Sequence, residues 1–272
     1  MRIESVTACA WDVELLEPFG IATGAQLVAH NALVKVRLAS GTTGLGEAAP
    51  FPAVNGETQA QTLEALENAA RELAGCSLAG VEALASDYQG LLANTPSALA
   101  ALEMALLDAD CRERGSSMFQ YFGGRSQQLF TDITIPTGSP DAAAAGAQRA
   151  LRGGFLTLKV KVGGEAFEHD VARLRCVVAA APSARLLLDA NASLSAPAAI
   201  ALVEALGQNS HQVVLFEQPC ARGDFAGSRA VRAAGLRVAA DEDARSAKDV
   251  RTLHQEQAAD VINFKLTKCG LT

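Results

Sequence analysis

Five charged residues recur at nearly constant spacing in the second half of the chain, each at the end of a short apolar run or just after it. They are Lys161, Asp189, Glu217, Asp241 and Lys265. The intervals between them are 28, 28, 24 and 24 residues. Each interval suits one strand, loop and helix unit, so the five side chains are expected at the carboxyl ends of successive parallel strands. Barrel active sites are built at that end.

These residue types indicate a metal site flanked by proton-transfer groups. Asp189, Glu217 and Asp241 form an oxygen-only ligand set suited to a hard cation such as Mg2+. Charges at the ends of buried strands are costly unless they are paired or metal-bound. Lysines on flanking strands can face each other across the acidic cluster. Burial near a cation would lower the pKa of such a lysine, so that its neutral amine acts as a base.

A second lysine precedes Lys161 on the same expected strand. Lys159 and Lys161 alternate with apolar residues over 156–162, so both lysines lie on one face and the aliphatic side chains on the other. Taken alone, a Lys-x-Lys pair is usually solvated, and a carboxylate after an apolar run is often a helix N-cap. The shared register of all five residues favours the functional interpretation.

The elements that must hold these residues alternate between short apolar runs and helical segments, which is typical of parallel βαβ units. The expected strands are 130–136, 155–162, 185–190, 213–217, 236–241 and 260–266. Helix boundaries are marked by Ser139-Pro140 and Gly153, by Pro182, by Ser195 and Gly207, and by Ser246 with Asp249. One helix face is predicted at Phe167, Val171, Leu174 and Val178. Six strands are fewer than the eight of a closed barrel, so we expect a fragment lacking the last two βα units.

The amino-terminal part follows a different pattern. Residues 1–50 alternate apolar and polar positions around a turn at 40–44, as antiparallel strands do. A helical pattern follows from Glu57 to about Arg114, with Thr95-Pro96 as the start of one helix. Gly44-x-Gly46 and Gly163-Gly164 lack a complete phosphate-loop pattern and are interpreted as turn glycines. We therefore expect an α+β domain over 1–125 and a (β/α) barrel domain, incomplete at its carboxyl end, over 126–272.

Composition excludes several classes of protein. A net charge of -7 and an aromatic content of 5% argue against a nucleic-acid partner. No apolar run approaches the ~18 residues of a membrane-spanning helix. The amino terminus carries no signal-peptide pattern. The 6 cysteines form no C-x-x-C pair, which fits free thiols in the cytoplasm.

The motifs together resemble those of the enolase superfamily, muconate-lactonising subgroup. They are Lys159-Val160-Lys161, Asp189-Ala190-Asn191, Glu217-Gln218-Pro219, Ala240-Asp241-Glu242 and Asn263-Phe264-Lys265-Leu266. The resemblance implies Mg2+ held by Asp189, Glu217 and Asp241, with Lys161 and Lys265 as the acid/base pair. It implies an amino-terminal capping domain whose loops Phe19–Gly24 and Pro50–Gly56 close over the substrate. Substrate-binding or supporting roles would fall to Lys159, Asn191, Glu242, Thr134, Phe19 and Thr23.

Within that subgroup, residues 131–136 and 265–270 are most similar to dipeptide epimerases of the L-Ala-D/L-Glu type. The implied reaction is a 1,1-proton transfer at the carbon alpha to a carboxylate, through an enolate, with one lysine on each face. The implied partner is a small carboxylate, with no nucleic acid and no membrane, and a homo-oligomer is left open. Alternatives with the same site are a muconate cycloisomerase or an o-succinylbenzoate synthase. Open sheet edges leave a third alternative, a non-catalytic truncated remnant.

Overall fold

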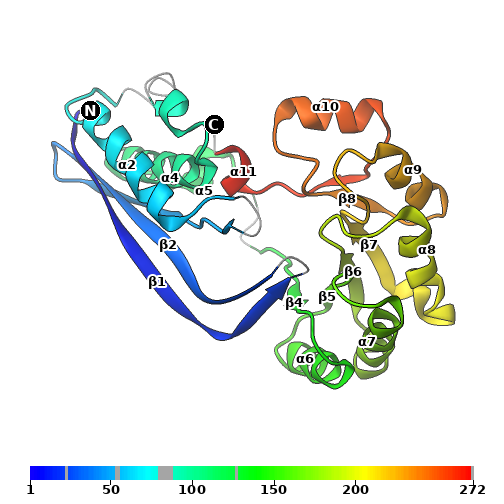
Figure 1. Cartoon of the computed structure of the whole chain (residues 1–272). Helices are drawn as coiled ribbons and strands as arrows, with labels where there is room; N and C mark the ends of the chain where they lie inside the picture. The colour runs from blue at the N-terminus through cyan, green and yellow to red at the C-terminus, as the bar shows by residue number, and fades with distance from the viewer. Residues whose placement is uncertain (22–23, 53–55, 79–87, 126–127, 271–272) are drawn as a thin grey trace. The chain divides into compact units, whose positions relative to one another are not determined.

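The chain divides into two compact units (Figure 1). The computed structural model describes residues 1–21, 24–52, 56–78, 88–125 and 128–270. The first unit comprises Met1–Glu17, Gln26–Gln128 and Lys265–Thr272, and the second comprises Pro18–Ala25 and Leu129–Phe264. Each unit thus contains a segment from the opposite half of the sequence. The domain ranges 1–125 and 126–272 stay a prediction.

The first unit is built on a three-stranded sheet in the order β1 (Ile3–Ile21), β2 (Gly24–Leu38) and β3 (Thr43–Ala48). Strands β2 and β3 pair antiparallel, from Ala32 opposite Ala48 to Arg37 opposite Thr43. Its helices are α2 (Gln59–Leu73), α4 (Pro96–Glu113), α5 (Met118–Tyr121) and α11 (Leu266–Cys269). The predicted antiparallel strands and the turn between β2 and β3 are confirmed.

Two glycines let β3 approach α4 closely. A Cβ atom on Gly44 would collide with the backbone of Ala105 and Ala109, and one on Gly46 would collide with the backbone of Ala101. Neither glycine has a positive φ. The interpretation of Gly44 and Gly46 as turn glycines is therefore wrong, because close packing of a strand on a helix requires them. Gly163 does lie in a turn, with φ +81°.

The buried carboxylate of Glu57 caps the start of α4. Its oxygens accept hydrogen bonds from the backbone N–H groups of Ser97 (2.9 Å) and Ala98 (3.4 Å) and from the hydroxyl of Thr62 (2.6 Å). Thr95 is the N-cap residue, as predicted, but its side chain makes no capping hydrogen bond. A residue from the start of α2 therefore satisfies the first turn of α4.

The second unit is a six-stranded parallel sheet in the order β4-β5-β6-β7-β8-β9. The strands are β4 (Ile133–Ile135), β5 (Thr157–Lys161), β6 (Arg185–Asp189), β7 (Val213–Glu217), β8 (Val238–Ala240) and β9 (Val261–Ile262). Sequence order and sheet order coincide, so each strand lies beside the next one in the chain. This is the arrangement that places the ends of successive strands in one row.

Helices follow the strands along one side of this sheet (Figure 1). They are α6 (Pro140–Arg152), α7 (Phe167–Ala180), α8 (Ala196–Glu204), η1 (Gly207–Gln212), α9 (Phe225–Ala233) and α10 (Ala247–Gln255). Ser139, Ser195 and Ser246 each cap the helix that follows, with the side-chain oxygen accepting a backbone N–H. The predicted starts of α6, α8 and α10 are confirmed.

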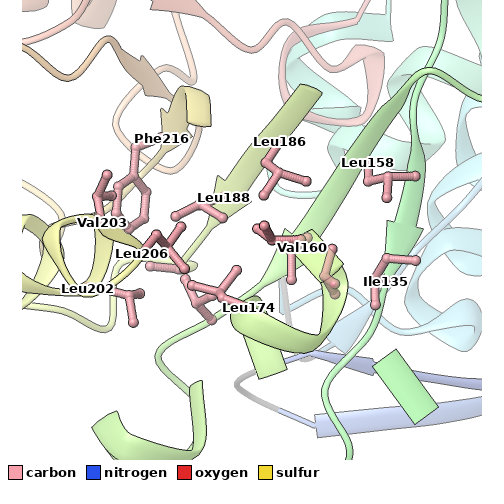
Figure 2. Close-up of a cluster of buried hydrophobic side chains, with 14 of the residues drawn as sticks. Ile135, Leu158, Val160, Leu174, Leu186, Leu188, Leu202, Val203, Leu206 and Phe216 are labelled. Atoms are coloured by element: carbon pink, nitrogen blue, oxygen red, sulfur yellow. The ribbon is translucent and has the colours of Figure 1, made fainter. Parts of the chain in front are cut away.

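The aliphatic faces of the strands form the core of the second unit. Leu158, Val160, Leu186 and Leu188 are fully buried against Leu174 of α7 and its neighbours (Figure 2). The alternate positions of β5 carry Lys159 and Lys161, so the predicted division of that strand into an aliphatic and a lysine face is confirmed. The predicted helix face is confirmed except at Phe167, the first residue of α7, which is exposed.

The first and last strands are shorter than predicted. β4 begins at Ile133, with Leu129 and Phe130 exposed ahead of it, and β9 ends at Ile262. Each has a strand neighbour on one side only among the described residues, so fewer ladder hydrogen bonds extend it. Lys265 consequently lies beyond the strand, as the N-cap residue of α11, and its predicted place within β9 is wrong. None of the described helices is long and apolar enough to cross a membrane.

Candidate active site

The parallel register brings three of the predicted residues into one row. Lys161 pairs with Asp189 between β5 and β6, and Asp189 pairs with Glu217 between β6 and β7. Glu217 pairs with Ala239 of β8, so Asp241 lies two positions further along, on the same face as Ala239. The sequence spacing thus predicted this edge of the sheet correctly from Lys161 to Asp241.

Two lysine ammonium groups lie among the carboxylates. Nζ of Lys159 is 2.8 Å from both carboxylate oxygens of Glu217 and 2.8 Å from Oδ2 of Asp189. Nζ of Lys161 donates to Oδ2 of Asp189 (2.7 Å) and to Oδ1 of Asn191 (2.8 Å). Asp189, Glu217 and Lys161 are buried and Lys159 is mostly buried. The carboxylates of Asp189 on β6 and Glu217 on β7 are thus paired with cations held on β5.

Burial and charge act in opposite directions on this cluster. Burial is the largest influence on Lys159 and lowers its pKa, but the charges and hydrogen bonds of Asp189 and Glu217 outweigh it, so the net pKa is raised. Burial likewise raises the pKa of Asp189, yet Lys159 and Lys161 bring its net value below the ordinary one. The pKa of Glu217 is raised by burial and by the charges of Asp189 and Asp241. The negative charges of Asp189 and Asp241 thus oppose ionisation of Glu217.

Asn191 joins Lys161 to the next acidic residue. Its Nδ2 donates to Oε1 of Glu242 at 3.2 Å, and its backbone N–H donates to Oδ1 of Asp189 at 3.0 Å. The other oxygen of Glu242, Oε2, is buried and has no hydrogen-bond partner among the described residues. Burial and the charge of Asp241 raise the pKa of Glu242. The structure thus brings Asn191 and Glu242 into the cluster, and the φ of +45° at Asn191 is the kind of strain found at functional sites.

Gln218 holds the turn that carries Asp241, and sequence reasoning assigned it no role. Its Oε1 accepts from the backbone N–H groups of Asp241 (3.0 Å) and Asp243 (3.3 Å). Its Nε2 donates to Oδ2 of Asp243 (2.8 Å) and to the carbonyl of Cys220 (3.2 Å). A φ of +35° turns this buried side chain inward. Its place directly after Glu217 was the signal available in the sequence.

Asn263, at the end of the row, also contacts the cluster. Its Nδ2 donates to Oε1 of Glu217 at 2.7 Å. Thr134 pairs with Lys159 between β4 and β5, two positions before the row that contains Lys161. The predicted roles of Lys265 and Thr134 stay predictions. Thr23 lies outside the described residues, and so does the side chain of Phe19.

The donor set suits a hard cation, although two of its three side chains here pair with an ammonium group. Asp189, Glu217 and Asp241 supply only oxygen donors, and Lys159 already places a positive charge between Asp189 and Glu217. Within the described ranges, no three His, Cys, Asp or Glu side chains are arranged to hold a metal ion. The chemistry therefore fits Mg2+ at these carboxylates, and Lys159 would have to leave them for an ion to be bound.

Comparison with known families agrees with this fold and site. Residues 3–123 match the mandelate racemase / muconate lactonizing enzyme N-terminal domain, and residues 142–272 match the enolase C-terminal domain-like family. The chain belongs to the mandelate racemase / muconate lactonizing enzyme family of the enolase superfamily. The predicted fold class, a capping domain followed by (β/α) barrel units, and the predicted class of enzyme, an isomerase, are thereby confirmed.

Individual relatives are named dipeptide epimerases. The chain is 46% identical over 270 residues to an aromatic dipeptide epimerase of Herpetosiphon aurantiacus, covering 99% of this chain and 76% of the relative. It is 34% identical over 273 residues to the L-Ala-D/L-Glu epimerase of Bacillus subtilis, covering 99% of this chain and 75% of that one. A dipeptide epimerase from Enterococcus faecalis, complexed with Mg and L-Leu-L-Tyr, superposes with a TM-score of 0.94 at 33% identity, over 99% of this chain and 76% of the other.

Proposed function

We propose that this chain carries out Mg2+-dependent epimerisation of a dipeptide by 1,1-proton transfer at the carbon alpha to a carboxylate, through an enolate. The observation that carries the proposal is the row formed by Lys161, Asp189 and Glu217 at adjacent strand ends. This row supports the proposal because Lys161, the proposed base, is in register with Asp189 and Glu217, the proposed metal ligands. The names of the relatives support dipeptides as the substrate class.

Three lysines of this chain have separate roles in the proposed reaction. Lys161 is positioned by Asp189 and Asn191, which accept hydrogen bonds from two of its three N–H donors. Lys161 removes or returns the α-proton on one face of the enolate, and Lys265 does so on the other. Once the Lys159 ammonium group has left Glu217, it pairs with the carboxylate of the substrate. Two lysines are needed because a 1,1-proton transfer removes a proton from one face of the α-carbon and returns a proton to the opposite face.

The metal contributes charge stabilisation. Asp189, Glu217 and Asp241 would hold Mg2+, which, when bound, supplies positive charge to stabilise the negative charge that develops on the substrate carboxylate. Asn191 and Gln218 keep two of these ligands in place, through the side chain of Asp189 and the backbone of Asp241 respectively. We further propose a cytoplasmic location, which the free state of the cysteines supports.

A dipeptide library tests the proposal. Purified protein is incubated with L,L-dipeptides in D2O, with Mg2+ or with EDTA, and loss of the α-proton signal is followed by NMR. We expect exchange and epimerisation of a subset of dipeptides with Mg2+ and none with EDTA. No exchange of any dipeptide would contradict the proposal. Turnover of a muconate or of the o-succinylbenzoate precursor instead would assign the site to one of the alternative reactions.

A further inference from the structure

Helix α7 contains a buried ion pair that the proposed reaction does not use directly. Nη1 of Arg173 lies 3.0 Å from Oδ1 of Asp170, and both residues are buried, with Arg173 0% exposed. They lie among the apolar residues Val171, Leu174 and Val178 of the same helix. Burying two charges costs free energy that their mutual attraction often fails to recover. Stability alone is therefore a weak explanation for this pair, and its other contacts become informative.

Those contacts all lead to the strand ends near Lys161. Nη1 of Arg173 also donates to the backbone carbonyl of Lys161 at 2.8 Å, and Nη2 donates to the carbonyl of Pro136, just after β4, at 2.6 Å. Oδ2 of Asp170 accepts the backbone N–H of Gly163 at 2.6 Å. The pair thus binds the end of β4, the end of β5 and the turn that follows β5. A planar guanidinium can connect separate acceptors in this way because its donors are fixed in direction.

The peptide unit that follows Lys161 is held from two sides. Its carbonyl accepts from Arg173, and its N–H, on Val162, donates to the carbonyl of Asp189 at 2.9 Å. The first contact comes from α7 and the second from the neighbouring strand. With both ends of the peptide fixed, the direction of the Cα–Cβ bond of Lys161 is fixed as well, and with it the place from which the side chain reaches Asp189 and Asn191.

We infer that Asp170 and Arg173 are positioning residues for Lys161, aligning its ammonium for proton transfer on one face of the substrate. This inference rests on the proposed function. It assigns the pair to only one of the two lysines, because the carbonyl that Arg173 binds belongs to Lys161. A purely structural role would affect both directions of the reaction alike, whereas a positioning role affects the lysine that the pair holds.

The test measures α-proton exchange in D2O for each epimer of a dipeptide separately. Arg173→Lys keeps the positive charge but loses the planar guanidinium and its several N–H donors. Arg173→Met removes the charge, and Asp170→Asn removes the negative charge that pairs with Arg173. For the epimer whose exchange is lost in Lys161→Ala, we expect kcat to fall by about tenfold to a hundredfold with little change in KM. For the other epimer we expect less than about twofold change. Arg173→Lys should retain more activity than Arg173→Met.

Arg175 provides a matched control on the same helix. It is exposed, and it donates to the carbonyl of Ala205 at 2.9 and 3.3 Å, away from the site. Arg175→Met should leave the exchange of both epimers unchanged. If Arg173→Met does not fold, as judged by circular dichroism, Arg173→Lys and Asp170→Asn decide. Equal slowing of both epimers, or slowing of neither, would overturn the positioning role alone; no exchange by the wild-type protein would overturn the proposed function with it.

Discussion

Lys159 donates to both carboxylate oxygens of Glu217, each at 2.8 Å, from a strand that is not adjacent to β7. Its side chain reaches across β6, where it also contacts Asp189. The ammonium group therefore lies where two of the three expected metal ligands meet. A metal ion held as proposed would therefore compete with the Lys159 ion pairs for the same oxygen atoms.

Removal of the Lys159 charge should strengthen metal binding. We expect Lys159→Met to bind Mg2+ at least about tenfold more tightly than the wild-type protein, because a positive charge beside the ligands is removed. Isothermal titration calorimetry measures this directly. Lys248→Met, which removes an exposed lysine on α10, should leave the affinity unchanged. Equal or weaker binding by Lys159→Met would contradict the competition.

Removal of a carboxylate from the proposed metal site should have the opposite effect in the same titration. Asp189→Asn, Glu217→Gln and Asp241→Asn should each weaken Mg2+ binding by at least about tenfold, since each removes an anionic oxygen donor. Asp141→Asn, at the exposed start of α6, serves as the control. If one of the three carboxylate variants bound Mg2+ as the wild-type protein does, that residue would not be a ligand.

Gln218 should matter both for stability and for the metal. We expect Gln218→Leu to lower the free energy of unfolding by about 2–4 kcal/mol, because it removes the donor to Oδ2 of the buried Asp243 and the acceptor of the Asp241 backbone N–H. Mg2+ affinity should fall about 10–100-fold as Asp241 loses its support. Urea unfolding and calorimetry provide the two measurements. The same substitution at the exposed Gln148 is the control. A Gln218→Leu protein with normal Mg2+ affinity would show that Asp241 does not need Gln218 for metal binding.

Much of the second unit could be predicted from the sequence because strand periodicity and spacing are local signals. The intervals from Lys161 to Asp189 and from Asp189 to Glu217 became direct register pairs. The helix starts at Ser139 and Ser246 could also be predicted from the sequence, because N-capping involves only neighbouring residues.

The rest depended on contacts between distant residues. Arg173 lies on a helix, outside the strand-end register, and its partners are backbone carbonyls that no residue type identifies. Burial lowers the pKa of Lys159, but the charges of Asp189 and Glu217 outweigh it, and this balance depends on side chains from two other strands. The helical cap supplied by Glu57 likewise comes from 40 residues away in the sequence, so propensity at Thr95 could not reveal it.

Glu57 should be a major determinant of stability in the first unit. We expect Glu57→Ala to reduce the free energy of unfolding by about 2 kcal/mol, because α4 loses an anionic cap at its amino terminus and the Thr62 hydroxyl loses one of its two acceptors. Urea unfolding followed by circular dichroism measures the change. Glu64→Ala, on the exposed face of α2, should change stability by less than about 0.5 kcal/mol. Equal effects of the two substitutions would contradict the capping role.

Asp260 should make stability depend on pH at the acid end. A hydrogen bond from Arg232 (2.6 Å) and one from the backbone N–H of Val238 (2.9 Å) hold its pKa below the ordinary value. Its contribution is therefore fully present above about pH 4, the unfolded value, and is lost as the pH falls through the folded-state pKa. We expect Asp260→Asn to cost about 1 kcal/mol at pH 7 and progressively less in acid. A difference from wild type that stays constant with pH would contradict this linkage.

The proposed reaction requires two lysines to act on opposite faces of one α-carbon, beside a metal held by three carboxylates. The most direct measurement is Mg2+-dependent α-proton exchange in D2O for each epimer of one dipeptide substrate, with Lys161→Ala and Lys265→Ala. We expect each variant to lose α-proton exchange of a different epimer and to retain exchange of the other. If both variants lost α-proton exchange of both epimers to the same extent, or if either variant retained exchange of both epimers, the proposed two-lysine reaction would be contradicted.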